Sequence, residues 1–198
     1  MRSSIRLLTT GIAFVVFGII MTVMVAGDLI DNAKQPADYS TLEMEDFKEG
    51  MIVEGDLPYN YDSYETVTKE KNGRSEIVGF YYLIDAGEDG FMALYTPQKA
   101  LIKQLDEQFK AYNNATTIAE LNDIEPVHFR GKVTKMDNDD KRILKQYLSD
   151  YEGNKESIDL YIKVTDGMPV FLLPVGIVVV IVGLLFVFLF VRRKMMGR

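Results

Sequence analysis

The strongest constraint on this chain is the distribution of charge around two long apolar runs, Leu7 to Ala26 and Met168 to Val191. Neither run contains Asp, Glu, Lys, Arg or His. At about 1.5 Å of rise per residue, helices of these lengths reach roughly 30 and 36 Å, which is enough to cross the hydrocarbon core of a bilayer. The sequence therefore predicts two transmembrane helices, at residues 7–27 and 168–191.

The short tails predict the orientation of these helices. Residues 1–6 and 192–198 contain six of the 22 Lys and Arg residues and no acidic residue. All 29 Asp and Glu residues lie between the runs, where 16 basic residues leave a net charge of −13. Because basic residues beside a transmembrane helix stay on the cytoplasmic side, we expect a multi-pass protein of the cell membrane with both termini cytoplasmic and the central domain extracellular.

A cleaved signal peptide is the alternative interpretation of the first run. Met1 to Arg6 is a basic start, and Val25-Ala26-Gly27 resembles a small-residue cleavage site. The apolar part of a signal peptide is usually about 7 to 15 residues long, so the length of this run favours an uncleaved anchor. Cleavage would leave one span, with the domain still outside.

One domain is expected between the helices. The chain has no Cys, so disulfides cannot stabilise this segment, and a core of about 120 ordered residues must do so. Residues 28–50 are an acidic lead-in, and residues 51–165 form the domain. Apolar and polar residues alternate over Met51 to Leu57, Val127 to Val133 and Ile158 to Val164, which predicts three half-buried strands.

A hairpin and two amphipathic helices complete the expected domain. Asn72-Gly73 predicts a tight turn between strands at 64–68 and 76–84, and a further strand follows at 91–95. Thr96 as N-cap and Pro97 at the first helical position predict the start of one helix. Apolar periodicity supports this helix and predicts another over about 140–151, with a short helical turn at 117–121. This order favours an α+β fold on a small, strongly bent antiparallel sheet, with an OB-like barrel as first choice and with Gly55 and Gly131 marking bulges.

Small residues recur along the apolar runs. Gly11 and Gly18 are seven residues apart, as are Gly176 and Gly183. Such stripes allow close helix packing, so we expect the two helices to pack antiparallel along them. The absence of ionisable residues from both runs argues against an ion or solute pathway, and leaves the lipid bilayer as the partner of these helices.

Paired carboxylates are the best catalytic candidates. With no Cys and one His, His128, neither a catalytic triad nor a zinc site is expected. Glu54 and Asp56 lie two residues apart on one strand face and suit acid–base chemistry. The competing interpretation is structural, because Arg130 and Lys132 occupy outward positions on the matching strand. We therefore expect no enzyme, with a membrane-tethered hydrolase as the alternative.

Two oxygen-rich loops are candidate calcium sites. Counted from Asp137, the EF-hand pattern fails, since the required Gly position is Arg142 and the closing Glu position is Leu148. Asp137 to Asp140 therefore predicts helix capping. A weaker candidate consists of Asp85, Glu88 and Asp89 in a hairpin loop. We expect neither a metal ion nor a cofactor.

Three tyrosines form the best candidate for a recognition surface. Tyr59, Tyr61 and Tyr64 lie in a turn-rich stretch, and their flat apolar rings with polar tips suit contacts with a protein or with sugar rings. The alternative is that they cover the end of the barrel. Nucleic acid is excluded as a ligand by the net charge of −13.

The layout, together with Gly50-Met-Ile-Val-Glu-Gly-Asp-Leu57 and Tyr81-Tyr82-Leu83-Ile84, resembles small two-span membrane proteins of unknown function from Gram-positive bacteria. This resemblance implies a location and no activity. The expected function is a non-catalytic interaction module of the cell envelope, with another envelope or membrane protein as its partner. A homo-oligomer and a sensor of an envelope glycan or cation stay open.

Overall fold

The computed structural model describes residues 2–87, 90–149, 156–164 and 171–196. The chain divides into two compact units. The first contains residues 1–34 and 167–198, and the second contains residues 35–166.

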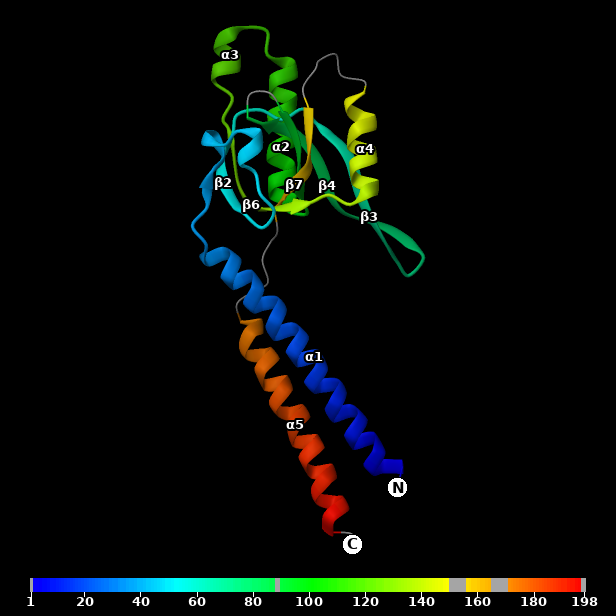
Figure 1. The fold of residues 1–198 in the computed structure, drawn as a ribbon. Coiled ribbons are helices and arrows are strands. Elements are labelled where there is room, and N and C mark those ends of the chain that lie inside the picture. The colour runs from blue at the N-terminus through cyan, green and yellow to red at the C-terminus, as the bar shows by residue number, and fades with distance from the viewer. Residues whose placement is uncertain (1, 88–89, 150–155, 165–170, 197–198) are drawn as a thin grey trace. The chain divides into compact units, whose positions relative to one another are not determined.

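The first unit is a pair of apolar helices, α1 (Arg2–Ala33) and α5 (Leu172–Met196), which pack side by side (Figure 1). A Cβ added at Gly11 would lie 2.9 Å from the carbonyl oxygen of Gly183, and one at Gly18 would lie 2.8 Å from that of Gly176. The chain direction from Gly11 to Gly18 in α1 therefore corresponds to the reverse direction, from Gly183 to Gly176, in α5, so the two helices are antiparallel. The four glycines lie where the two backbones approach most closely.

Both helices are long and apolar enough to cross a membrane. The segments with this length and composition are Leu8–Ala33 and Leu172–Met196, and most of their large apolar side chains are exposed. The polar Thr22 hydroxyl donates a hydrogen bond to the Gly18 carbonyl oxygen at 2.8 Å, so it does not present an unsatisfied donor to lipid.

The second unit is an α+β domain built on a seven-stranded mixed sheet. Its strands are β1 (Ala37–Asp38), β2 (Ile52–Leu57), β3 (Ser63–Lys71), β4 (Arg74–Ala86), β5 (Gly90–Thr96), β6 (Val127–Lys135) and β7 (Glu156–Lys163). Its helices are α2 (Lys99–Asn114), α3 (Ile118–Asn122) and α4 (Asn138–Leu148), with short 3₁₀ turns η1 (Tyr39–Thr41) and η2 (Met44–Asp46).

The strand order is β1-β2-β6-β7-β5-β4-β3. The prediction of an antiparallel sheet was wrong at two places, because β1 pairs with β2 and β5 pairs with β7 in parallel. Among the described residues, β1 and β3 are the two ends of the pairing order, and an OB-like barrel is not confirmed. Strand β7 lies between β6 and β5. This position depends on pairing between residues far apart in the chain, which local periodicity does not predict.

The Asn72-Gly73 hairpin is confirmed. Asn72 has φ 54° and Gly73 has φ 72°, as the two central positions of a tight hairpin turn require. The paired residues run from Ser63 opposite Tyr82 to Lys71 opposite Arg74, so the hairpin is longer than the predicted strands.

Strand β4 separates two apolar cores. Tyr82 and Ile84 pack in one core with Leu105 of α2, whereas Tyr81 and Leu83 pack in the other with Leu144 of α4. Since successive side chains of a strand point to opposite faces, α2 and α4 cover opposite faces of the sheet (Figure 1). The apolar character of both faces of 77–84 predicted this double burial.

Three local predictions need correction. The ladder between β2 and β6 has no register shift at Gly55 or Gly131, so neither glycine marks a bulge there. A Cβ at Gly55 would lie 2.8 Å from the Cβ of Tyr39, and one at Gly131 would lie 2.5 Å from Ile162 Cγ2, so both allow close packing. Helix α2 begins at Lys99, because Thr96 is the last paired residue of β5.

Substitution Gly18→Leu is expected to separate the two helices, because its side chain would meet the α5 backbone. Gly27→Leu is the matched control on the same helix, since nothing lies within 4 Å of a Cβ there. In a chain without native Cys, Phe14→Cys and Phe186→Cys report the pairing through a bifunctional thiol cross-linker, since the two rings lie 6.0 Å apart. Cross-linking should fall about tenfold for Gly18→Leu only. Equal cross-linking in both variants would contradict this packing.

Candidate functional site

The two carboxylates Glu54 and Asp56 lie on β2, opposite basic residues of β6. Glu54 is opposite Arg130, and the Arg130 guanidinium donates a hydrogen bond to Glu54 Oε2 at 2.6 Å. Asp56 is opposite His128, and the imidazole Nδ1 lies 2.9 Å from Asp56 Oδ1. Lys132 is opposite Ile52, so it is not the cross-strand partner of either carboxylate.

His128 links the two carboxylates. Its Nε2 lies 3.4 Å from Glu54 Oε1, on the other side of the ring from Asp56. Because the two ring nitrogens point to different acidic groups, the three side chains form a row and do not converge on one point. The imidazole is 62% exposed, so each contact is a surface contact worth about 1 kcal/mol or less.

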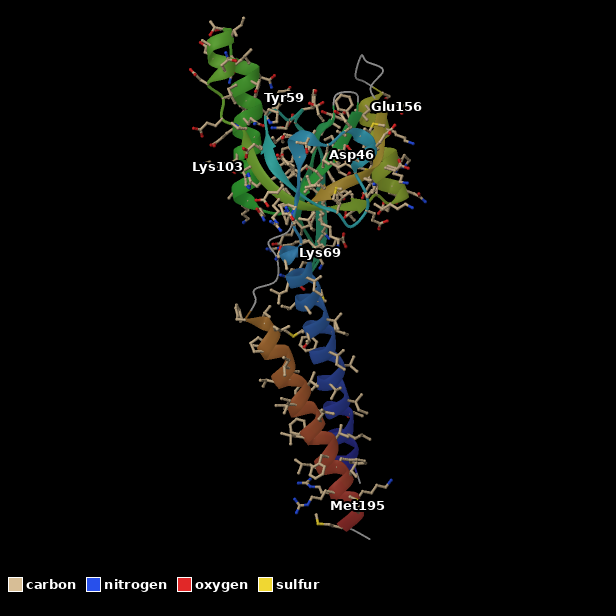
Figure 2. The ribbon with its side chains drawn as sticks, turned by 60° about the vertical axis from the view of Figure 1, so that its left-hand side comes forward. Asp46, Tyr59, Lys69, Lys103, Glu156 and Met195 are labelled. Carbon is tan, nitrogen blue, oxygen red and sulfur yellow. The ribbon has the colours of Figure 1, made fainter. Side chains whose placement is uncertain are left out.

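Tyr59 and Tyr61 belong to a connected row of aromatic rings. The Tyr59 ring makes edge contacts with Tyr61 and Tyr112, each at a centroid distance of 4.7 Å. Tyr61 packs in turn on Phe91 at 5.1 Å, and its hydroxyl donates to Asp85 Oδ1 at 3.0 Å. Tyr59 is half-buried, in the upper part of the domain in Figure 2.

A buried polar pair fixes the loop that carries Tyr59. Asn60 is fully buried and donates to Gln108 Oε1 at 2.8 Å. The Gln108 amide nitrogen donates to the carbonyl oxygen of Leu57 at 2.8 Å, and the Tyr112 hydroxyl donates to that of Pro58 at 2.9 Å. The loop is therefore bonded to α2 by side chains whose loss would leave buried polar groups unsatisfied.

An open pocket of about 580 Å³ borders this loop. It lies between α2 and the segment that leads into β6, and Gln108 belongs to both the pocket wall and the loop anchor. We call it the acidic pocket. Its acidic lining residues are Glu107, Glu120, Asp123 and Glu125, its other lining residues include Gln104, Ala111 and His128, and its described lining contains no Lys or Arg.

Tyr64 lies in a different environment from Tyr59. Its ring stacks on Tyr81 at 5.9 Å and contacts Tyr147 at 5.4 Å, in the core beneath α4. Burial raises the pKa of the Tyr64 hydroxyl, so it stays protonated. Its oxygen is buried and has no hydrogen-bond partner among the described residues. The structure does not bring Tyr64 to the surface formed by Tyr59 and Tyr112.

Glu65, the neighbour of Tyr64, is an acid in an unfavourable environment. Its Oε2 atom is buried without a hydrogen-bond partner among the described residues. Burial raises the pKa of the Glu65 carboxyl, and the charges of Asp140 and Asp137 raise it further. Burial likewise raises the pKa of Asp140, against the lowering effect of a hydrogen bond from the Tyr81 hydroxyl.

The oxygen-rich loops make other contacts. Asp137 is the N-cap of α4, where its Oδ1 accepts hydrogen bonds from the backbone N–H groups of Asp139 and Asp140. Asp85 accepts the hydroxyl of Tyr61, whereas Glu88 and Asp89 lie outside the described residues. Within the described part of the chain, no three His, Cys, Asp or Glu side chains are grouped to hold a metal ion.

Sequence patterns did not predict Asn60, Gln108 and Tyr112 as parts of this surface. Tyr112 lies on the apolar face of the predicted helix, and Gln108 is a polar residue one turn before it. A buried polar residue on such a face signals a specific hydrogen-bond partner. The partner itself, the loop 57–60, is about 50 residues away in sequence, as the hydrogen bonds show.

The family described as "Domain of unknown function (DUF8577)" matches residues 1–192. No curated protein and no solved structure matches the chain.

Substitution Glu65→Gln should remove a pH-dependent loss of stability. The folded state holds the pKa of Glu65 above its ordinary value of 4.5, so it binds a proton more tightly than the unfolded chain. Stability from this group is complete below the ordinary pKa and is lost as the pH rises through the raised one. Relative to the unsubstituted chain, the free energy of unfolding of Glu65→Gln should therefore increase between about pH 4 and pH 7.

The measurement is urea unfolding of the full chain in mild detergent, followed by tyrosine circular dichroism, because the chain has no Trp. Glu70→Gln, at an exposed position on the same strand, is the control and should leave the pH dependence unchanged. Parallel pH profiles for Glu65→Gln and the unsubstituted chain would contradict the raised pKa.

Proposed function

The chain belongs to the family with this domain of unknown function, so we propose its role from the geometry of its own residues. It is a two-span membrane protein that presents an acidic α+β domain outside the cell, as a non-catalytic interaction module of the cell envelope. Its binding surface consists of Tyr59, Tyr112 and the acidic pocket. We propose further that its source is a Gram-positive bacterium, as the resemblance of its layout implies.

The tails support this orientation. Arg193 and Lys194 follow the apolar part of α5 within its last turn, and Arg2 and Arg6 precede that of α1. Because short basic flanks remain in the cytoplasm, both helix ends support the same topology, with residues 35–166 outside.

The observation that carries the proposal is the fixed position of the Tyr59 loop. The hydrogen bonds of Asn60 and Gln108 hold the loop on α2, so little ordering entropy is lost when a partner binds. Half-buried Tyr59 and Tyr112 offer apolar faces with polar tips, a composition enriched at protein interfaces. The adjoining pocket supplies acidic groups for a polar or cationic contact.

The hydrolase alternative has weaker support. Glu54 and Asp56 each have a cross-strand partner, Arg130 and His128, and these contacts occupy carboxylate oxygens that acid–base catalysis would use. The cation-sensor alternative has weaker support too, since the Asp85 carboxylate accepts a hydrogen bond from Tyr61. Sugar stacking on Tyr59 is compatible with the same surface.

Single cysteines test the topology. Asn72→Cys in the domain should react with a membrane-impermeant thiol reagent in intact cells, because the position is exposed on the hairpin. Lys194→Cys and Arg6→Cys should react only after lysis. The native chain has no Cys, so it gives the background. Labelling of Lys194→Cys in intact cells would overturn the proposed orientation.

Affinity purification tests the interaction role. The full chain, carried in mild detergent through a C-terminal tag, should retain a near-stoichiometric envelope protein, and a version lacking residues 51–164 should lose it. The double variant Tyr59→Ala/Tyr112→Ala should reduce recovery of the partner about tenfold, since buried aromatic anchors dominate such interfaces.

Thr66→Ala is the control, because Thr66 is exposed on β3 and is not part of the proposed surface. The domain should stay folded in all variants, as judged by tyrosine circular dichroism. Equal recovery with and without residues 51–164 would refute the proposed role.

A further inference from the structure

The outer part of the β3–β4 hairpin is a basic projection from an acidic domain. Every residue from Thr68 to Ile77 is exposed, and we call this segment the hairpin tip. Its ladder extends over four residue pairs, which is roughly 13 Å at about 3.3 Å per residue. The tip has three basic and two acidic residues, whereas the whole segment between the apolar runs has a net charge of −13.

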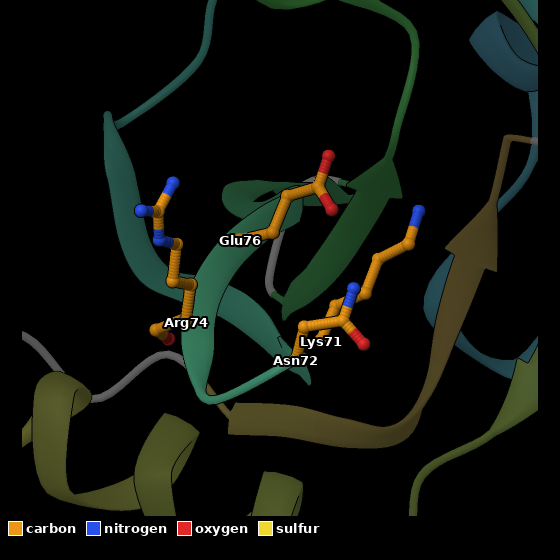
Figure 3. A pocket seen from close by; sticks show the side chains of 5 residues that line it. Lys71, Asn72, Arg74 and Glu76 are labelled. Carbon is orange, nitrogen blue, oxygen red and sulfur yellow. The ribbon is translucent and has the colours of Figure 1, made fainter.

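The basic residues of the hairpin tip share one face. Lys69 is opposite Glu76, and Lys71 is opposite Arg74. Because opposite residues in a ladder share a face and alternate residues return to it, the three cations lie together with Glu76. Figure 3 shows the Lys71 and Arg74 side chains on either side of Glu76, around a shallow hollow at the turn.

The acidic pocket has the opposite charge. Glu107, Glu120, Asp123 and Glu125 contribute four carboxylates to its lining, of which Glu107 also pairs with exposed Lys103 one turn earlier on α2, at 3.6 Å. The pKa of Glu120 is lowered by hydrogen bonds from the backbone N–H and the hydroxyl of Thr116, so this carboxylate stays ionised. Within one domain the two surfaces cannot meet, because the hairpin tip and α3 lie at opposite ends of it (Figure 1).

We propose that the hairpin tip of one copy docks into the acidic pocket of a second copy. The argument is charge complementarity: Lys69, Lys71 and Arg74 meet a pocket whose described lining has four carboxylates and no Lys or Arg. A head-to-tail contact of this kind leaves a free tip and a free pocket at the ends, so it builds rows of copies. The inference rests on the proposed interaction role and names its partner.

Confinement to one membrane favours this contact. Both copies are anchored by α1 and α5, which raises their effective concentration for a contact that is individually weak. Exposed ion pairs are weak and are screened by dissolved ions, so the contact should weaken as the salt concentration rises.

The test is site-specific cross-linking between two differently tagged full-length copies in the membrane. One copy carries Asn72→Cys at the hairpin tip, and the other carries Ala111→Cys in the pocket wall. Since the native chain lacks Cys, every disulfide identifies one pair of positions. We expect mild oxidation to give the 72–111 product about tenfold above the 72–72 and 111–111 products.

Charge-reversal variants of the two copies provide the decisive comparison. Lys71→Glu/Arg74→Glu in the first copy should reduce the 72–111 product about tenfold, and Asp123→Lys/Glu125→Lys in the second copy should restore it. Restoration also shows that the reversed hairpin is folded. The matched control is Lys48→Glu/Lys163→Glu in the first copy, which changes the charge equally at exposed positions elsewhere and should leave the product unchanged.

A 72–111 product no larger than the 72–72 product would overturn the inference, as would failure of the reversed pair to restore it. The proposed function is judged separately by the affinity purification. If an unlike partner is still lost with residues 51–164 while no 72–111 product forms, the interaction role stands and the second copy is the wrong partner. If both experiments are negative, both proposals fail.

Discussion

The burial of strand β4 on both faces is the constraint on which the domain depends. Tyr82 and Ile84 enter the core covered by α2, and Tyr81 and Leu83 enter the core covered by α4. A shift of one residue in this strand would exchange its contributions to the two cores, so the register is strongly specified. The hairpin tip and the anchor of the Tyr59 loop both take their positions from this strand and from α2, which packs on it.

Polar side chains fix contacts between elements that the packing of the apolar cores does not determine. Gln108 lies on the buried side of α2 and satisfies loop carbonyl oxygens, so the loop has one position on the helix. The row Arg130, Glu54, His128 and Asp56 joins β2 to β6 on the sheet surface. Its contribution to stability is much smaller, because water screens these contacts. Acidic groups outside both arrangements line the pocket, among them Glu107, which pairs with Lys103, and Glu120, which belongs to the capping box of α3.

Local signals in the sequence predicted the local structure well. The Asn72-Gly73 turn, the apolar periodicity of α2 and the helical turn at 117–121 all appear in the structure, since each depends on residues close together in the chain. The predicted bulges at Gly55 and Gly131 were wrong because both glycines serve contacts with distant residues, Tyr39 and Ile162. Of the tyrosines proposed as a recognition surface, Tyr59 is half-buried beside Tyr112, whereas Tyr64 is stacked beneath α4, a difference that depends on contacts with distant helices.

The sequence alone determined two apolar helices with basic ends, an acidic α+β domain between them and most of its elements, because composition and periodicity report directly on the solvent that each residue meets. Tertiary structure decided the strand order, the insertion of β7 between β5 and β6, and the meeting of Gln108 with the Tyr59 loop. Those pairings join residues far apart in the chain, and their free energy depends on how whole faces pack, which local sequence does not record.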